Sequence, residues 1–198
     1  MPKNYLVLDF ETTGLDYKTE QVIEVGAIKY DEEFNEVGSF HTYVNLRSGN
    51  VLSDFIKDLT GITEDKLEFG MSEPFALHTV EGMADEDTIV VAQYAPFDLA
   101  YLSRYGIYPT RYICTKTLTD IAEPFESSNL GKTCARNGIV LENAHTAVAD
   151  VRATAELLKL RLSQGLVDCE NCVTEQPDRP LNFVPYYTKE VFNKEDFK

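Results

Sequence analysis

Four acidic residues occupy positions where the sequence pattern predicts apolar side chains. Asp9 and Glu11 end a short apolar run and, because side chains alternate along a strand, they point to one face. Asp98 and Asp150 each fall on the apolar stripe of an expected helix. The first pair follows the apolar residues Leu6, Val7 and Leu8, while the stripe neighbours are Tyr101, Leu102 and Tyr105 for Asp98, and Ala153, Thr154 and Leu157 for Asp150. A buried carboxylate without a partner is costly, so each acid needs a counter-charge.

Divalent cations are the simplest counter-charge, because the chain has 18 Lys and Arg against 33 Asp and Glu. A metal site whose ligand atoms are all oxygens favours Mg²⁺ or Mn²⁺ over zinc. Two such ions, roughly 3.5–4 Å apart, are the usual arrangement for in-line displacement at a phosphodiester. Taken alone, each acid is more typical of a helix cap or a surface charge, and the first-turn position of Asp98 suits the helix dipole. We expect the four acids to converge and bind two divalent cations.

His145 lies five residues before Asp150. Five residues turn a helix through about 500°, so the two side chains would not share a face. We therefore place His145 in the loop or first turn ahead of the helix, where it could accept a proton from a water at neutral pH. From position alone, His145 is better described as a surface histidine. His41 and His78 have no such acidic neighbourhood, and we assign them no role.

The strands and helices that position these residues are predicted from hydrophobic periodicity and from the positions of Gly and Pro. Apolar and alternating runs predict strands at 5–10, 21–30, 39–45, 88–92 and 112–115. Helical spacing predicts helices at 51–58, 72–84, 96–105, 117–122, 130–137 and 146–163. The first three strands form an antiparallel meander, and strands then alternate with helices. This order predicts an α/β domain with a mixed central sheet flanked by helices.

The chain divides into an expected domain at 1–165 and a C-terminal extension at 166–198. The extension contains Pro177, Pro180 and Pro185 without clear periodicity, and we expect it to wrap the domain or bind a partner. Cys169 and Cys172 have the spacing of half a zinc site but lack a second pair, so we expect reduced thiols. There is no membrane-length apolar stretch and no signal peptide, so we expect a cytoplasmic protein without membrane contact.

The formal net charge of −15 limits how the protein could bind nucleic acid. Affinity for a phosphate backbone normally comes from Lys and Arg. The charge therefore argues against tight, non-specific binding to a duplex. It fits a protein that holds only a few terminal nucleotides, or one that gains affinity from a partner or from bound metal ions.

Three segments together resemble the DEDDh family of 3′–5′ exonucleases. They are Asp9–Leu15, Val91–Asp98 and His145–Asp150, the last in the His-x-Ala-x-x-Asp form, and Leu59–Thr63 is similar to a family linker. This family shares a ribonuclease H-like fold with the proofreading epsilon subunits of bacterial replicative DNA polymerases. The resemblance covers about residues 4–163, and each motif alone is only moderately specific.

The resemblance implies a role for each matching residue. Asp9 would bridge both metal ions, Glu11 and Asp150 would complete the site that activates water, and Asp98 would hold the second ion. His145 would be the general base. The substrate contacts would be Thr12, Thr13, Gly14, Leu15, Tyr94 and Phe97, with Leu15 wedged against the last base.

The implied substrate is the 3′ end of a single nucleic-acid strand, with DNA favoured and nucleoside 5′-monophosphates as products. The implied partner is a DNA polymerase or another replication or repair protein. Gln93 and Tyr94 stand where the family often has His-Asn, so substrate contacts are expected to differ. Tyr94 could stack on a base or simply pack in the core.

Two other functions compete with this interpretation. A nuclease-like binding module that recruits polymerase or repair partners would be expected to lose metal ligands, and none is missing. A phosphatase using Asp9 as nucleophile would prefer a second Asp where Glu11 stands, and it offers no role for His145. The choice between DNA and RNA, and between a proofreading subunit and a stand-alone enzyme, stays open.

Overall fold

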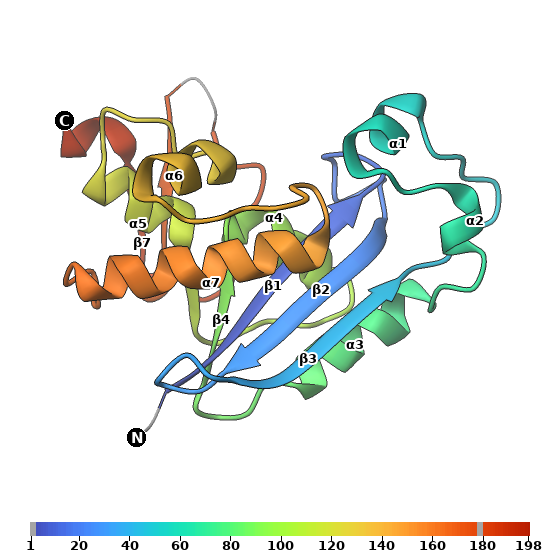
Figure 1. Ribbon diagram of the computed structural model, residues 1–198, viewed down its shortest axis with the longest axis horizontal. Coiled ribbons are helices and arrows are strands. Elements are labelled where there is room, and N and C mark those ends of the chain that lie inside the picture. The colour runs from blue at the N-terminus through green and yellow to red at the C-terminus, as the bar shows by residue number, and fades with distance from the viewer. Residues whose placement is uncertain (1–2, 178–179) are drawn as a thin grey trace.

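The computed structural model describes residues 3–177 and 180–198. Five strands form one mixed sheet in the order β3-β2-β1-β4-β5 (Figure 1). The antiparallel part consists of β1 (Asn4–Thr12), β2 (Val22–Tyr30) and β3 (Glu36–Tyr43), and the parallel part adds β4 (Thr88–Ala92) and β5 (Tyr112–Cys114) beside β1. The predicted α/β fold with a mixed central sheet is confirmed.

Helices cover both faces of the sheet. The long helix α7 (Ala147–Ser163) crosses one face over β1 and β2, and α3 (Glu73–Gly82) and α4 (Ala95–Ser103) lie against the other (Figure 1). The other α-helices are α1 (Asp54–Thr60), α2 (Glu64–Leu67), α5 (Thr115–Ala122) and α6 (Leu130–Asn137). Within the described residues, none of the helices combines the length and apolarity needed to span a bilayer.

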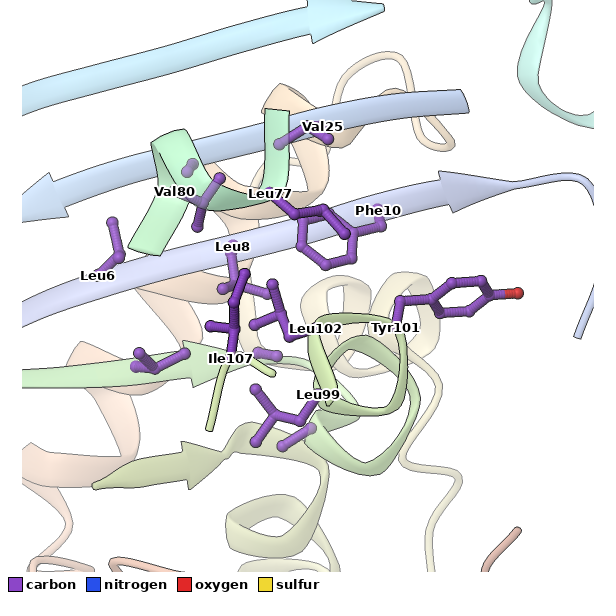
Figure 2. Packing of buried hydrophobic residues seen from close by; sticks show 14 of the residues in the cluster. Leu6, Leu8, Phe10, Val25, Leu77, Val80, Leu99, Tyr101, Leu102 and Ile107 are labelled. Atoms are coloured by element: carbon purple, nitrogen blue, oxygen red, sulfur yellow. The ribbon is translucent and has the colours of Figure 1, made fainter. Parts of the chain in front are cut away.

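Alternation along β1 assigns its side chains to two cores. Leu6, Leu8 and Phe10 are buried in the cluster shared with α3 and α4, which Figure 2 shows around Leu77 and Leu102. The intervening residues of β1 face α7, where Tyr5 and Val7 pack with Val151, Ala155 and Leu158. Full burial of each large apolar side chain contributes about 1.5–3 kcal/mol. Asp9 and Glu11 follow Tyr5 and Val7 in the same alternating set, so their side chains point toward α7.

The C-terminal extension has regular structure that the sequence pattern does not predict. Strands β6 (Cys172–Glu175) and β7 (Glu190–Asn193) pair in parallel, and the 3₁₀ helix η1 (Lys194–Phe197) follows. Four-residue strands are too short for alternation to be detected. Val173 is fully buried in the same cluster as Leu6 and Leu8. The C-terminal residues therefore pack directly on the preceding part of the chain, beside α5.

Candidate active site

The first two carboxylates stand where β1 meets the start of α7. Asp9 pairs in register with Gly26 of β2, and Glu11 pairs with Glu24. A Cβ atom on Gly26 would lie 2.7 Å from the backbone carbonyl carbon of Ala147, the first residue of α7. Glycine thus allows α7 to begin in direct contact with β2. This contact places the first turn of the helix, including Asp150, over the acidic end of β1.

The other two acids come from helices on opposite faces of the sheet. Asp98, in the first turn of α4, is buried with 4% of its surface exposed. The Oδ1 atom of Asp150, in the first turn of α7, is buried without a hydrogen-bond partner among the described residues. Both acids raise the pKa of Asp9 through their charge, which means that both lie close to it.

The pKa values of all four carboxyl groups are raised, and burial is the largest cause for each. The pKa of Glu11 rises to about 7, with further contributions from Asp150 and Glu24, and that of Asp98 rises to about 8. The pKa of Asp9 is raised well above its usual range, and that of Asp150 is also raised. Within residues 3–177 and 180–198, no Lys or Arg forms an ion pair with any of the four.

His145 joins this group from the loop ahead of α7, where the sequence places it. Its backbone has a positive φ of 66°, a conformation that is uncommon outside glycine and that often marks a functional position. One ligand atom each of Glu11, His145 and Asp150 lies within 4.8 Å of the other two. The donor set of carboxylate oxygens, with an unpaired buried oxygen on Asp150, fits Mg²⁺ or Mn²⁺.

The turn after β1 presents Leu15 to solvent. The hydroxyl of Thr12 donates to the carbonyl oxygen of Gly14 at 2.7 Å, and the hydroxyl of Tyr101 donates to the same oxygen at 2.8 Å. Thr13 donates its hydroxyl to the Glu20 carboxylate. These bonds stabilise the turn, and the Leu15 side chain is left 79% exposed. Contact of Thr12 and Thr13 with a nucleotide stays a prediction.

Tyr94 lines two hollows. The smaller is mainly apolar, and its other lining residues are Leu15, Tyr17, Pro96, Phe97, Ala100, Asn182 and Phe183. The larger is a cavity of about 570 Å³ that is also lined by Asp9, His145 and Asp150. The predicted substrate contacts Leu15, Tyr94 and Phe97 therefore share one wall. Residues of the extension line both hollows.

Sequence reasoning missed Glu24. This residue is 3% exposed, and its carboxylate accepts a hydrogen bond from the backbone nitrogen of Ala147 at 3.3 Å. The Nε2 atom of His41 lies 2.7 Å from the same carboxylate, so His41 does have an acidic neighbour, contrary to the expectation above. In the sequence, Glu24 is an acid within the mainly apolar strand predicted at 21–30. The same kind of pattern identified Asp9 and Glu11, so it could have identified Glu24 as well.

Sequence comparison finds exonucleases and polymerases. Residues 6–158 match the family model described as Exonuclease. The chain is 32% identical over 159 residues to the PolC-type DNA polymerase III of Thermotoga maritima, covering 77% of this chain and 11% of that protein. It is 30% identical over 165 residues to the 3′–5′ exonuclease DinG of Staphylococcus aureus, covering 79% of this chain and 18% of that protein. The chain thus spans a small part of either relative.

Comparison of folds gives a consistent result. E. coli exonuclease I in complex with a dT13 oligonucleotide superposes with a TM-score of 0.71 at 21% identity, over 83% of this chain and 42% of that chain. The nuclease domain of 3′hExo, a DEDDh family member bound to rAMP, gives a TM-score of 0.69 at 18% identity, over 83% of this chain and 94% of that chain. At these identities the likeness establishes a shared fold.

Proposed function

The chain belongs to the exonuclease family, and we propose that it removes nucleotides one at a time from the 3′ end of a single nucleic-acid strand. DNA is the favoured substrate, and nucleoside 5′-monophosphates are the products. The direction agrees with the name of the DinG relative, a 3′–5′ exonuclease. The preference for DNA is supported by the PolC-type DNA polymerase relative and by the dT13 complex of a protein with the same fold.

The four carboxylates would hold two divalent cations, Mg²⁺ or Mn²⁺. Asp9 would bridge both ions, Glu11 and Asp150 would complete one site, and Asp98 would serve the other. When bound, such ions neutralise charge on the phosphodiester and lower the pKa of a water. The protein contributes a cluster of buried and half-buried carboxylate oxygens that carry no competing Lys or Arg ion pair among the described residues.

The remaining residues would position the strand and transfer the proton. His145, next to Glu11 and Asp150, would accept the proton of the attacking water. Leu15 and Phe97 would hold the terminal base in the apolar hollow, and Tyr94 offers an aromatic face for stacking. The turn built by Thr12, Thr13 and Gly14 would set the position of Leu15.

One observation carries the proposal: ligand atoms of Glu11, His145 and Asp150 meet within 4.8 Å, although their residues are up to 139 positions apart. The test is digestion of matched single-stranded DNA and RNA oligonucleotides, labelled at either end, with Mg²⁺, Mn²⁺ or EDTA. We expect metal-dependent release of mononucleotides from the 3′ end, faster from DNA. Folded protein that releases nothing from either strand would refute the proposal, and release from the 5′ end would refute its direction.

A DNA polymerase is the proposed partner. In the PolC-type relative, the matching segment is only 11% of a chain that is named as a polymerase. An exonuclease that acts beside a polymerase receives strand ends directly, which would compensate for the weak backbone affinity expected at a net charge of −15. Preferential degradation of a mismatched primer terminus over a matched one would support this association, and equal rates on both would contradict it.

A further inference from the structure

The cavity that contains the acids also has a cationic wall. Lys116 of α5 and Lys194 at the start of η1 line the same 570 Å³ space as Asp9, His145 and Asp150. The lining also includes the neutral polar groups of Gln93, Tyr94, Ser127, Ser128, Asn129 and Thr174. Glu175 is a further acid in the lining. The volume lies within the usual range for a site that holds a small ligand.

A buried aspartate holds the two lysines together. The Nζ atom of Lys116 lies 2.7 Å from Oδ2 of Asp120, and the Nζ atom of Lys194 lies 2.7 Å from Oδ1. Thr174 donates its hydroxyl to Oδ2 at 2.6 Å, which fixes the carboxylate from the side of the extension. Asp120 is fully buried, and Lys194 is 5% exposed. These lysines are therefore built into the wall and are not mobile surface side chains.

The cluster has surplus charge and surplus donors. Two ammonium groups face one carboxylate, which leaves a net charge of +1 on Lys116, Asp120 and Lys194 taken together; Glu175, Asp9 and Asp150 are further charges in the lining of the cavity. Each ammonium has three N–H donors. Lys194 donates one hydrogen bond, to the backbone oxygen of Glu126 at 2.8 Å, and forms an ion pair with Asp120. Lys116 also lies 5.7 Å from the ring centre of Tyr94, so the charge borders the predicted base-stacking residue. One phosphodiester, with a charge of −1, would neutralise the cluster.

We propose that Lys116 and Lys194 bind a phosphate of the substrate strand other than the one that is cleaved, so that the C-terminal extension forms part of the substrate site. The proposal rests on the proposed nuclease function, because it assigns a second phosphate contact to the same bound strand. Such a contact would add local affinity for the phosphate backbone to a protein whose net charge is −15.

The test compares two substrates in three proteins. An oligonucleotide carries further phosphates, whereas thymidine 5′-monophosphate p-nitrophenyl ester carries only the phosphodiester to be cleaved. Lys116→Met should lower kcat/KM on the oligonucleotide by about tenfold, the low end for a hydrogen bond to a charged group, and leave the ester unaffected. Asp120 keeps Lys194 as a partner in this variant. Lys198→Met, on an exposed lysine of the same extension, is the matched control and should change neither rate.

Two further measurements locate the contact. The slope of log kcat/KM against log salt should become shallower by about 0.7 in Lys116→Met, the value for one phosphate of a single strand. A neutral methylphosphonate placed at successive linkages should slow the native protein about tenfold at one linkage that is not cleaved. That loss should disappear in Lys116→Met. Lys194→Met should behave alike, provided that thermal melting shows it folded.

Failures of the two proposals are distinguishable. Native protein that cleaves neither substrate overturns the nuclease function. Native protein that cleaves both, with Lys116→Met equally active on both, overturns only the phosphate site. A loss in Lys116→Met that is equal on the two substrates also overturns it, because that pattern indicates a structural defect.

Discussion

Glu24 of β2 accepts a hydrogen bond from the backbone nitrogen of Ala147, the first residue of α7, at 3.3 Å. This contact joins residues that are 123 positions apart and satisfies one of the free N–H groups at the start of the helix. Gly26, two residues along β2, allows the close approach. His145 and Asp150 flank this junction on either side. The position of β2 against α7 therefore determines where these two residues stand relative to Glu11.

Substitution of Gly26 tests this junction. In Gly26→Ala the new Cβ would lie 2.7 Å from the backbone of Ala147, so α7 must shift. We expect a loss of about 1–3 kcal/mol in the free energy of unfolding, as for other overpacked sites, and a larger proportional loss of kcat than of substrate affinity. Urea unfolding and steady-state kinetics measure both. Gly38→Ala on β3 is the control, because a Cβ there meets nothing within 4 Å; an equal effect at both positions would contradict the argument.

The carboxylate cluster predicts how stability depends on pH when metal is absent. The folded-state pKa of Glu11 is about 7 and that of Asp98 is about 8, whereas both are about 4 in an unfolded chain. Between these values the folded state binds more protons than the unfolded state, so the free energy of unfolding falls as pH rises from about 4 to about 8. Glu11 alone would account for a loss on the order of 3 kcal/mol.

Chemical denaturation in EDTA at pH 5 and pH 8 measures this fall. Glu11→Gln should flatten the dependence, because its amide does not titrate. Added Mn²⁺ should stabilise the protein most at pH 8, where the ligands are ionised. Stability that stays constant or rises from pH 5 to pH 8 in EDTA would be inconsistent with the raised pKa values.

Removing one buried charge should separate stability from activity. In Asp98→Asn the amide keeps the shape of the side chain and removes a charge that repels Asp9. We expect the metal-free protein to melt at a higher temperature at pH 8. Hydrolysis should fall by at least about 100-fold, which is the upper end of the loss for a residue that only supports a metal ligand. Asp65→Asn, on an exposed residue of α2, should change neither property. A less stable Asp98→Asn variant would argue against unfavourable burial of the charge.

The sequence predicts those parts of the fold and site whose signal is local. The apolar run at 88–92 corresponds to β4, and alternation in β1 correctly directs Asp9 and Glu11 to one face. The apolar stripe containing Asp98 correctly predicts its burial. The Lys116–Asp120–Lys194 cluster could not be predicted, because Lys194 reaches Asp120 only through the folding of the extension. The role of Glu24 likewise depends on a backbone group 123 residues away.

Substitution of His145 tests the proton-transfer step. Asparagine tolerates a positive φ better than most residues, so His145→Asn should preserve the loop, whose φ here is 66°. We expect kcat to fall by about 10²–10⁴, the usual contribution of a general base, with little change in the free energy of unfolding. Stabilisation of the protein by Mn²⁺ should be retained, because the four carboxylates remain. His78→Asn, at an exposed histidine beside Glu81, is the matched control. If His145→Asn kept native kcat, another group would have to accept the proton; if it lost Mn²⁺ stabilisation as well, His145 would be a metal ligand and not a base.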